Sequence, residues 1–114
     1  MTKIEKLKNA GCDVETAVKR CDDDVAFYLE LVESALEESR YEKIRSQLEA
    51  DDWKGAFESF HALKGISANL SLTPLTQTAS ELTELFRPLK KAPFTEPLLR
   101  LLEERKKLSD CLKE

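Results

Sequence analysis

One histidine, His61, is the residue in this chain of 114 amino acids whose type is best suited to chemistry. A neutral imidazole is a nucleophile and a proton acceptor near neutral pH. A single histidine does not supply a multi-histidine metal site, and the chain has no GxxxxGK[ST] or GxGxxG loop that would bind a nucleotide. The chemistry therefore depends on what surrounds His61.

The segment 53–70 has the apolar spacing of one amphipathic helix. On a wheel at about 100° per residue, the side opposite His61 forms a core face. This face consists of Trp53, Ala56, Phe60, Leu63, Ile66, Ser67 and Leu70. The imidazole is therefore predicted to face solvent. A core histidine held by one hydrogen bond is disfavoured by this pattern, and an inert surface histidine stays an alternative.

Small and apolar residues share the exposed face with His61. Glycine inside a helix costs about 1 kcal/mol of stability relative to alanine. An exposed Gly65 therefore indicates a surface without side-chain bulk, which a partner can approach closely. Ala68 extends this low surface, and Phe57 adds an exposed apolar contact. Close packing of a neighbouring helix is the alternative explanation for Gly65.

Lys64 places an ammonium group within one turn of the imidazole. It would neutralise the charge of a phosphoryl group on His61, and it would disfavour the imidazolium form, which is not nucleophilic. A solvated lysine is the ordinary explanation for this residue alone. The combination of His61, Lys64 and Gly65 predicts a phosphoryl acceptor on a docking face.

Capping residues and glycine divide the N-terminal half into helices. We expect one short helix over 3–10, ended by Gly11, and a second over 13–20. The acidic run 22–24 then starts a longer helix with an apolar stripe made of Phe27, Tyr28, Leu31, Val32, Ala35 and Leu36. Residues 40–50 either continue that helix or bend away from it.

The C-terminal half begins with the helix that carries His61, capped by the pair Asp51-Asp52. Thr73 is predicted to cap the next helix with Pro74 at its first position, and the last helix starts at 95–97. These elements predict an all-α protein: an antiparallel up-down four-helix bundle with short N-terminal helices, forming a single domain over residues 1–114.

Composition limits the partners. The chain is 41% hydrophobic and 35% charged, with only 3 Gly and 4 Pro, which favours helices over a β-sandwich. A net charge of −4 predicts no binding to nucleic acid or to a membrane surface. Cys12, Cys21 and Cys111 lack metal-site spacing and are expected to be reduced thiols. With no signal peptide or membrane span, the protein is expected in the cytoplasm, bound by other proteins.

The run HALKGISANL, residues 61–70, resembles the signature of histidine-containing phosphotransfer (HPt) domains, H-x-L-K-G-x-[SA]-x-x-[apolar]. The similarity extends over nearly the whole chain. The matching features are Asp52-Trp53 before the histidine helix, Ala79 and Leu82 on the next helix, and the opening segment 13–28.

Two positions depart from the HPt pattern. The family usually has glycine where this chain has Ser71, which puts the shape of the exit from the histidine helix in doubt. Some relatives carry a longer amide at the position of Thr83, where it touches the phosphoryl group. Arg87, one turn further on, is a candidate to approach the same region.

The resemblance implies a phosphocarrier without its own ATP site, not an enzyme. His61 would accept a phosphoryl group through Nε2 from an aspartate of a receiver domain and pass it to another response-regulator receiver. A hybrid sensor histidine kinase is the other implied partner. The chain needs no cofactor or metal of its own, since Mg²⁺ belongs to the receiver. We expect a monomer whose partner-binding residues are Phe57, Gly65, Ala68 and Arg87.

Two other functions compete with the relay. A degenerate HPt domain would bind receivers without transferring phosphoryl groups, and Ser71 and Thr83 are the features that favour it. A small hydrolase using His61 is disfavoured because the wheel places no carboxylate beside the imidazole.

Overall fold

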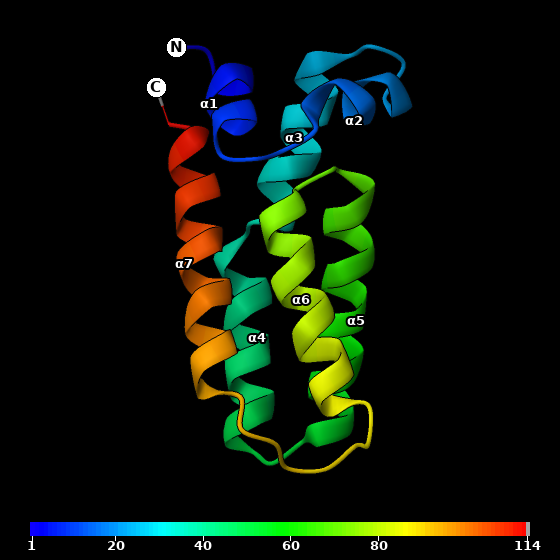
Figure 1. Cartoon of the computed structure of the whole chain (residues 1–114), viewed down its shortest axis with the longest axis vertical. Coiled ribbons are helices and arrows are strands. Elements are labelled where there is room, and N and C mark those ends of the chain that lie inside the picture. The colour runs from blue at the N-terminus through cyan, green and yellow to red at the C-terminus, as the bar shows by residue number, and fades with distance from the viewer. Residues whose placement is uncertain (114) are drawn as a thin grey trace.

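The computed structural model describes residues 1–113, which form seven α-helices and no strand. They are α1 (Lys3–Asn9), α2 (Val14–Arg20), α3 (Val25–Ala35), α4 (Glu38–Glu49), α5 (Trp53–Asn69), α6 (Thr73–Phe86) and α7 (Thr95–Cys111). Helices α4 to α7 run along the long axis of the molecule, while α1 and α2 lie together at one end (Figure 1). The all-α prediction is confirmed. Within residues 1–113, no helix has both the length and the apolar composition that a membrane span requires.

Aspartates cap three of the helices at the predicted places. The side chains of Asp13, Asp24 and Asp52 each accept a hydrogen bond from the backbone N–H three residues later. The prediction for Thr73 is wrong, because the N-cap of α6 is Leu72. The carbonyl of Leu72 already accepts the first helical bond, from the N–H of Thr76 at 3.0 Å, which makes Thr73 the first helical residue.

Four helices end in the same way, with a left-handed residue directly after the C-cap. The φ angles are 99° at Gly11, 53° at Asp22, 56° at Asp51 and 55° at Ser71. After α5, the N–H of Leu72 bonds to the carbonyl of Ser67 at 2.9 Å, and that of Ser71 to Ala68 at 3.0 Å. This pair of bonds is the Schellman motif that glycine favours. Ser71 therefore forms the turn that glycine would form, and α6 folds back along α5.

Helices α3 and α4 are separate, which resolves the boundary that the sequence left open. The last carbonyls of α3 find partners outside the helix. The hydroxyl of Tyr41 donates to the carbonyl of Ala35 at 3.0 Å, and Nε of Arg105 donates to that of Leu36 at 2.8 Å. The Arg105 guanidinium also lies 5.2 Å from the centre of the Tyr41 ring. Residues from α4 and α7 thus stabilise the break.

The apolar stripe of α3 differs from the prediction at Phe27, which is 47% exposed. The buried side of α3 is centred on Tyr28, Val32 and Ala35, and Phe27 lies about 100° away from Tyr28 around the helix. The buried hydroxyl of Tyr28 donates to the carbonyl of Leu70 at 2.9 Å and so fixes α3 to the end of α5.

An aromatic cluster closes the other end of the molecule. The ring of Phe86 stacks on Phe60 at 5.8 Å and on Trp53 at 5.9 Å between ring centres, and Phe94 packs on Phe86 at 6.0 Å. These rings join the first half of α5 to the last turn of α6. The core therefore holds α5 and α6 against each other along their lengths.

The three cysteines are free thiols, and Cys12 is buried while Cys21 and Cys111 are half-buried. Burial raises the pKa of Cys12 to about 11, and the nearby Cys111 adds to this shift. A neutral, enclosed thiol is a poor nucleophile, so Cys12 acts as a packing residue.

Replacing Ser71 by glycine is expected to stabilise the fold by about 1 kcal/mol, because glycine adopts the left-handed conformation without the penalty that a Cβ brings. Urea unfolding of the two proteins measures this difference. As a control, Ser80→Gly places glycine inside α6 and should destabilise by about 1 kcal/mol. A Ser71→Gly protein no more stable than the wild type would contradict this account of the turn.

Candidate functional site

Helix α5 presents His61 on the side opposite its packed face. Ala56, Phe60, Leu63 and Ser67 are buried, as the wheel predicts, and His61 is exposed. The buried hydroxyl of Ser67 donates to the carbonyl of Leu63 at 2.7 Å and accepts from the hydroxyl of Thr76 at 2.9 Å. This last bond joins α5 to α6 at a position six residues after His61 along the chain.

Phe57 lies between His61 and a residue from another helix. Its ring centre is 5.8 Å from that of His61, and the guanidinium of Arg87 lies 5.4 Å from the same ring centre. The sequence predicted an exposed Phe57, but the side chain is half-buried. Arg87, at the C-cap of α6, covers part of the ring by a cation–π contact.

Arg87 is held by a carboxylate on its own helix. Its Nε and one terminal nitrogen donate to the two oxygens of Glu84 at 2.9 and 2.8 Å. Such a two-pronged pair fixes the orientation of the guanidinium as well as its position. Arg87 is therefore oriented by Glu84 on one side and by Phe57 on the other.

Besides the hydrogen bonds from Arg87, charges on α5, the helix that carries His61, also affect the pKa of Glu84. Hydrogen bonds from Arg87 lower the pKa of Glu84 most, the charge of Arg87 adds to this, and the charges of Lys64 and His61 contribute less. Lys64, whose ammonium group the sequence predicted within one turn of the imidazole, is half-buried, whereas the alternative explanation was a solvated side chain. The imidazole thus has charged side chains of both signs near it from two helices, because Glu58, three residues before it on α5, is a second nearby carboxylate.

The face continues from His61 toward the end of α5 through Gly65 and Ala68, which are both exposed. Within residues 1–113, a Cβ added to Gly65 would meet no heavy atom from another part of the chain within 4 Å. Close packing of a neighbouring helix therefore does not explain this glycine. Beyond Ala68, Arg20 of α2 donates to the carbonyl of Asn69 at 2.8 Å and so borders the face.

The two departures from the HPt pattern have clear positions. Ser71 keeps the left-handed turn, so the exit from α5 is not altered. Thr83 is fully buried, and its hydroxyl donates to the carbonyl of Ala79 at 2.7 Å. In this arrangement the Thr83 hydroxyl is used inside α6 and is not presented to the exposed face of α5.

In the part of the chain that the structure describes, Ser67 and Glu84 do not form a hydrolytic arrangement with His61. Glu84 does bring a carboxylate near the imidazole, which corrects the expectation from the wheel, but both of its oxygens accept from Arg87. The nearby Ser67 is buried with its hydroxyl bound inside the core. The pair Ser67 and Glu84 therefore lacks the geometry of a nucleophile and an orienting carboxylate.

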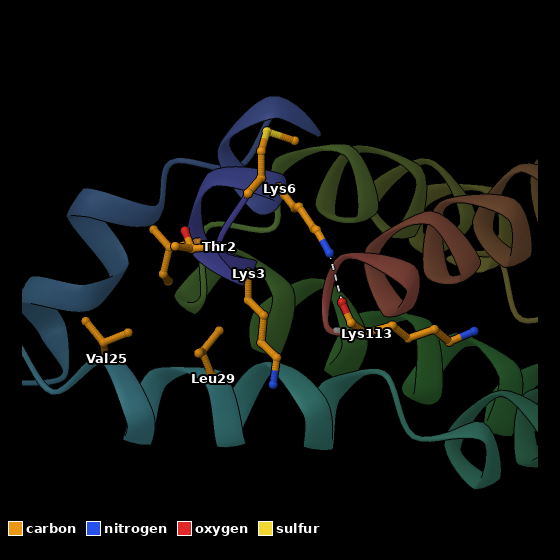
Figure 2. A pocket seen from close by; sticks show the side chains of 8 residues that line it. Thr2, Lys3, Lys6, Val25, Leu29 and Lys113 are labelled. Atoms are coloured by element: carbon orange, nitrogen blue, oxygen red, sulfur yellow. Dashed lines mark hydrogen bonds between the residues drawn. The ribbon is translucent and has the colours of Figure 1, made fainter.

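A surface groove of about 580 Å³ lies away from His61, between α1 and α3 at the end of the bundle. Figure 2 shows Val25 and Leu29 on one wall, and Lys6 reaching across to donate to the carbonyl of Lys113 at 2.8 Å. None of the residues that line this groove belongs to α5 or α6. The groove and the histidine face are separate features of the surface.

The sequence did not reveal Glu84 and Arg20 as neighbours of the histidine face. A helical wheel describes one helix, and these residues come from α6 and α2. The only pattern that pointed to Glu84 is its spacing of three residues from Arg87, which is typical of an ion pair on a helix surface.

Replacing Gly65 by alanine is expected to stabilise the protein by about 1 kcal/mol, since the added methyl group meets open space and removes the entropic cost of glycine in a helix. Thermal or urea unfolding measures the change. Gly55→Ala serves as the opposite case, because a Cβ there would collide with the capping side chain of Asp52. A loss of stability in Gly65→Ala would show that the position is constrained within the fold.

Comparison with known protein families matches residues 23–113 to the Hpt domain. This stretch covers most of the chain and includes α3 to α7 with His61 near the middle of α5. No curated protein and no solved structure matches the chain. The match agrees with the resemblance seen in residues 61–70, and we conclude that the chain belongs to the Hpt domain family, whose members serve phosphotransfer in phosphorelays.

Proposed function

We propose that this protein is a phosphocarrier that accepts a phosphoryl group on His61 from the aspartate of one receiver domain and passes it to the receiver of another response regulator. The observation that carries the proposal is the exposed position of His61 on α5, beside a glycine that the fold itself does not require. The stability lost at Gly65 then has a purpose, which is to let the surface of a receiver approach the imidazole closely.

The chemistry asked of this chain is limited. Nε2 of a neutral imidazole attacks the phosphorus, the bond from phosphorus to the aspartyl oxygen breaks, and the aspartate leaves as a carboxylate. Phosphoryl transfer of this kind needs in-line positioning and neutralisation of charge more than covalent assistance. Lys64, half-buried beside the imidazole, supplies a cation for this purpose.

The remaining requirements fall on the partners. We expect Mg²⁺ and the acidic residues that bind it to be supplied by the receiver, so that this chain works without a cofactor and is not itself an enzyme. The receiver of a hybrid sensor histidine kinase is the expected donor. Phe57, Gly65, Ala68 and Arg87 form the docking face around His61, and the protein acts as a monomer in the cytoplasm.

For the architecture, we propose the antiparallel four-helix bundle that the sequence predicted. The long helices along the main axis and the three-residue turn 70–72, which reverses the chain between α5 and α6, support this arrangement. The bundle gives α5 a rigid position from which to present the imidazole.

Phosphotransfer from a panel of radiolabelled receiver domains tests the proposal. Label is expected on the wild-type protein and not on His61→Gln, and it should survive base and be lost in acid, as a phosphoramidate bond does. Because His61 is exposed, the variant should keep its fold, which circular dichroism checks. Binding of receivers without transfer of label would instead support the degenerate docking module.

Replacing Lys64 by alanine is expected to slow transfer about tenfold without abolishing it, because one charge-assisted contact to the phosphoryl group is lost. The difference should shrink at high salt, where the ammonium is screened. Lys43→Ala removes an equal charge from α4 and should leave the transfer rate unchanged. Equal rates for Lys64→Ala and wild type at low salt would contradict the role of this lysine.

A further inference from the structure

Arg87 holds the most constrained cationic group near His61, and its constraint comes from Glu84. Both carboxylate oxygens accept from the guanidinium at 2.8 and 2.9 Å, while the Phe57 ring lies 5.4 Å beneath it and also contacts the imidazole. The guanidinium and the imidazole therefore lie against the same aromatic ring. Movement of the Arg87 side chain off Glu84, with Phe57 as the shared neighbour, is the step that would bring the cation to a group on His61.

The negative charge of a phosphoryl group on His61 would attract the Arg87 guanidinium away from Glu84. In the unphosphorylated protein, the carboxylate is the strongest acceptor bound by Arg87, and the pair lies exposed at the surface. A phosphoryl group on His61 would add about two negative charges and three acceptor oxygens to the imidazole that packs on Phe57. Arginine binds phosphate and carboxylate with the same two-pronged geometry, so the phosphoryl group competes directly with Glu84.

The geometry points to an ion-pair exchange: Arg87 leaves Glu84 for the phosphoryl group on His61, and the freed Glu84 carboxylate then repels the phosphorylated imidazole and limits its lifetime. In this arrangement Glu84 is a positioning residue that acts through Arg87. The inference rests on the proposed function, because it requires His61 to carry the phosphoryl group.

The lowered pKa of Glu84, caused mainly by the hydrogen bonds from Arg87, keeps the carboxylate ionised at neutral pH. Its charge interaction with His61 and Lys64 places it within electrostatic reach of the histidine helix. An ionised carboxylate beside a phosphorylated imidazole has two effects. It repels the phosphoryl oxygens, and it favours protonation of the ring, which promotes breakage of the N–P bond.

A small phosphoryl donor tests the exchange without any receiver. Phosphoramidate transfers its phosphoryl group to an exposed imidazole, with the N–P bond of the donor breaking and ammonia leaving. The phosphorylated protein is then followed by NMR, using the Nε–H resonance of Arg87. We expect this resonance to shift on phosphorylation, while that of Arg100, paired with Glu96 and Glu81 on another face, stays in place.

The second readout is the rate at which phosphorylated His61 loses its group. Glu84→Gln is expected to slow this loss roughly two- to fivefold, and Arg87→Gln to speed it by a similar factor, as the size of exposed charge interactions suggests. Glu81→Gln is the matched control, since it also removes a carboxylate of α6 that pairs with an arginine. This control should decay at the wild-type rate.

The outcomes separate the two proposals. An unmoved Arg87 resonance together with wild-type decay of Glu84→Gln would overturn the exchange, even if receivers transfer phosphoryl groups to His61. A shifted resonance and slower decay in Glu84→Gln would support it, even if every receiver failed to transfer, in which case the relay would be the proposal that fails.

Discussion

The packing of α5 against α6 fixes the rotation of α5 about its axis, and every property of the site depends on that rotation. Phe60 stacks on Phe86 near one end of the contact, and Ser67 bonds to Thr76 near the other. With 3.6 residues per turn, the packing of Phe60, Leu63 and Ser67 on one side of α5 leaves His61 and Gly65 on the other side, away from the core. A rotation by one residue, about 100°, would carry His61 toward the core and bring buried Leu63 into solvent.

The turn between α5 and α6 is the second determinant, because it brings the last turn of α6 back beside the middle of α5. Ser71 accepts a left-handed conformation there, and the two bonds to Ser67 and Ala68 set the angle of return. Glu84 and Arg87 reach the histidine face only through this reversal. The candidate site is therefore a property of two helices, although the proposed nucleophile, His61, belongs to one.

The balance of charge around His61 fits the proposal that this residue both accepts and releases a phosphoryl group. Lys64 and Arg87 favour a phosphoryl group, whereas Glu84 holds Arg87 and opposes added negative charge. If only cations surrounded His61, they would stabilise its phosphorylated form strongly. The carrier would then return the phosphoryl group slowly, because the rate depends on the free-energy gap between the phosphorylated protein and the transition state. Charges of opposite sign on exposed side chains keep this stabilisation of the phosphorylated form small.

The helices, their aspartate caps, the buried face of α5 and the outward direction of His61 were all predictable from the sequence, since local hydrogen bonds and apolar periodicity determine them. The sequence also carried the HPt pattern of residues 61–70. Only the tertiary structure decided the break between α3 and α4, the exposure of Phe27 and the cover of Arg87 over Phe57. Only the tertiary structure also placed Glu84 near the histidine face. Contacts between helices depend on the rotation of each helix about its axis and on the crossing angle, and the sequence pattern of one helix does not specify these.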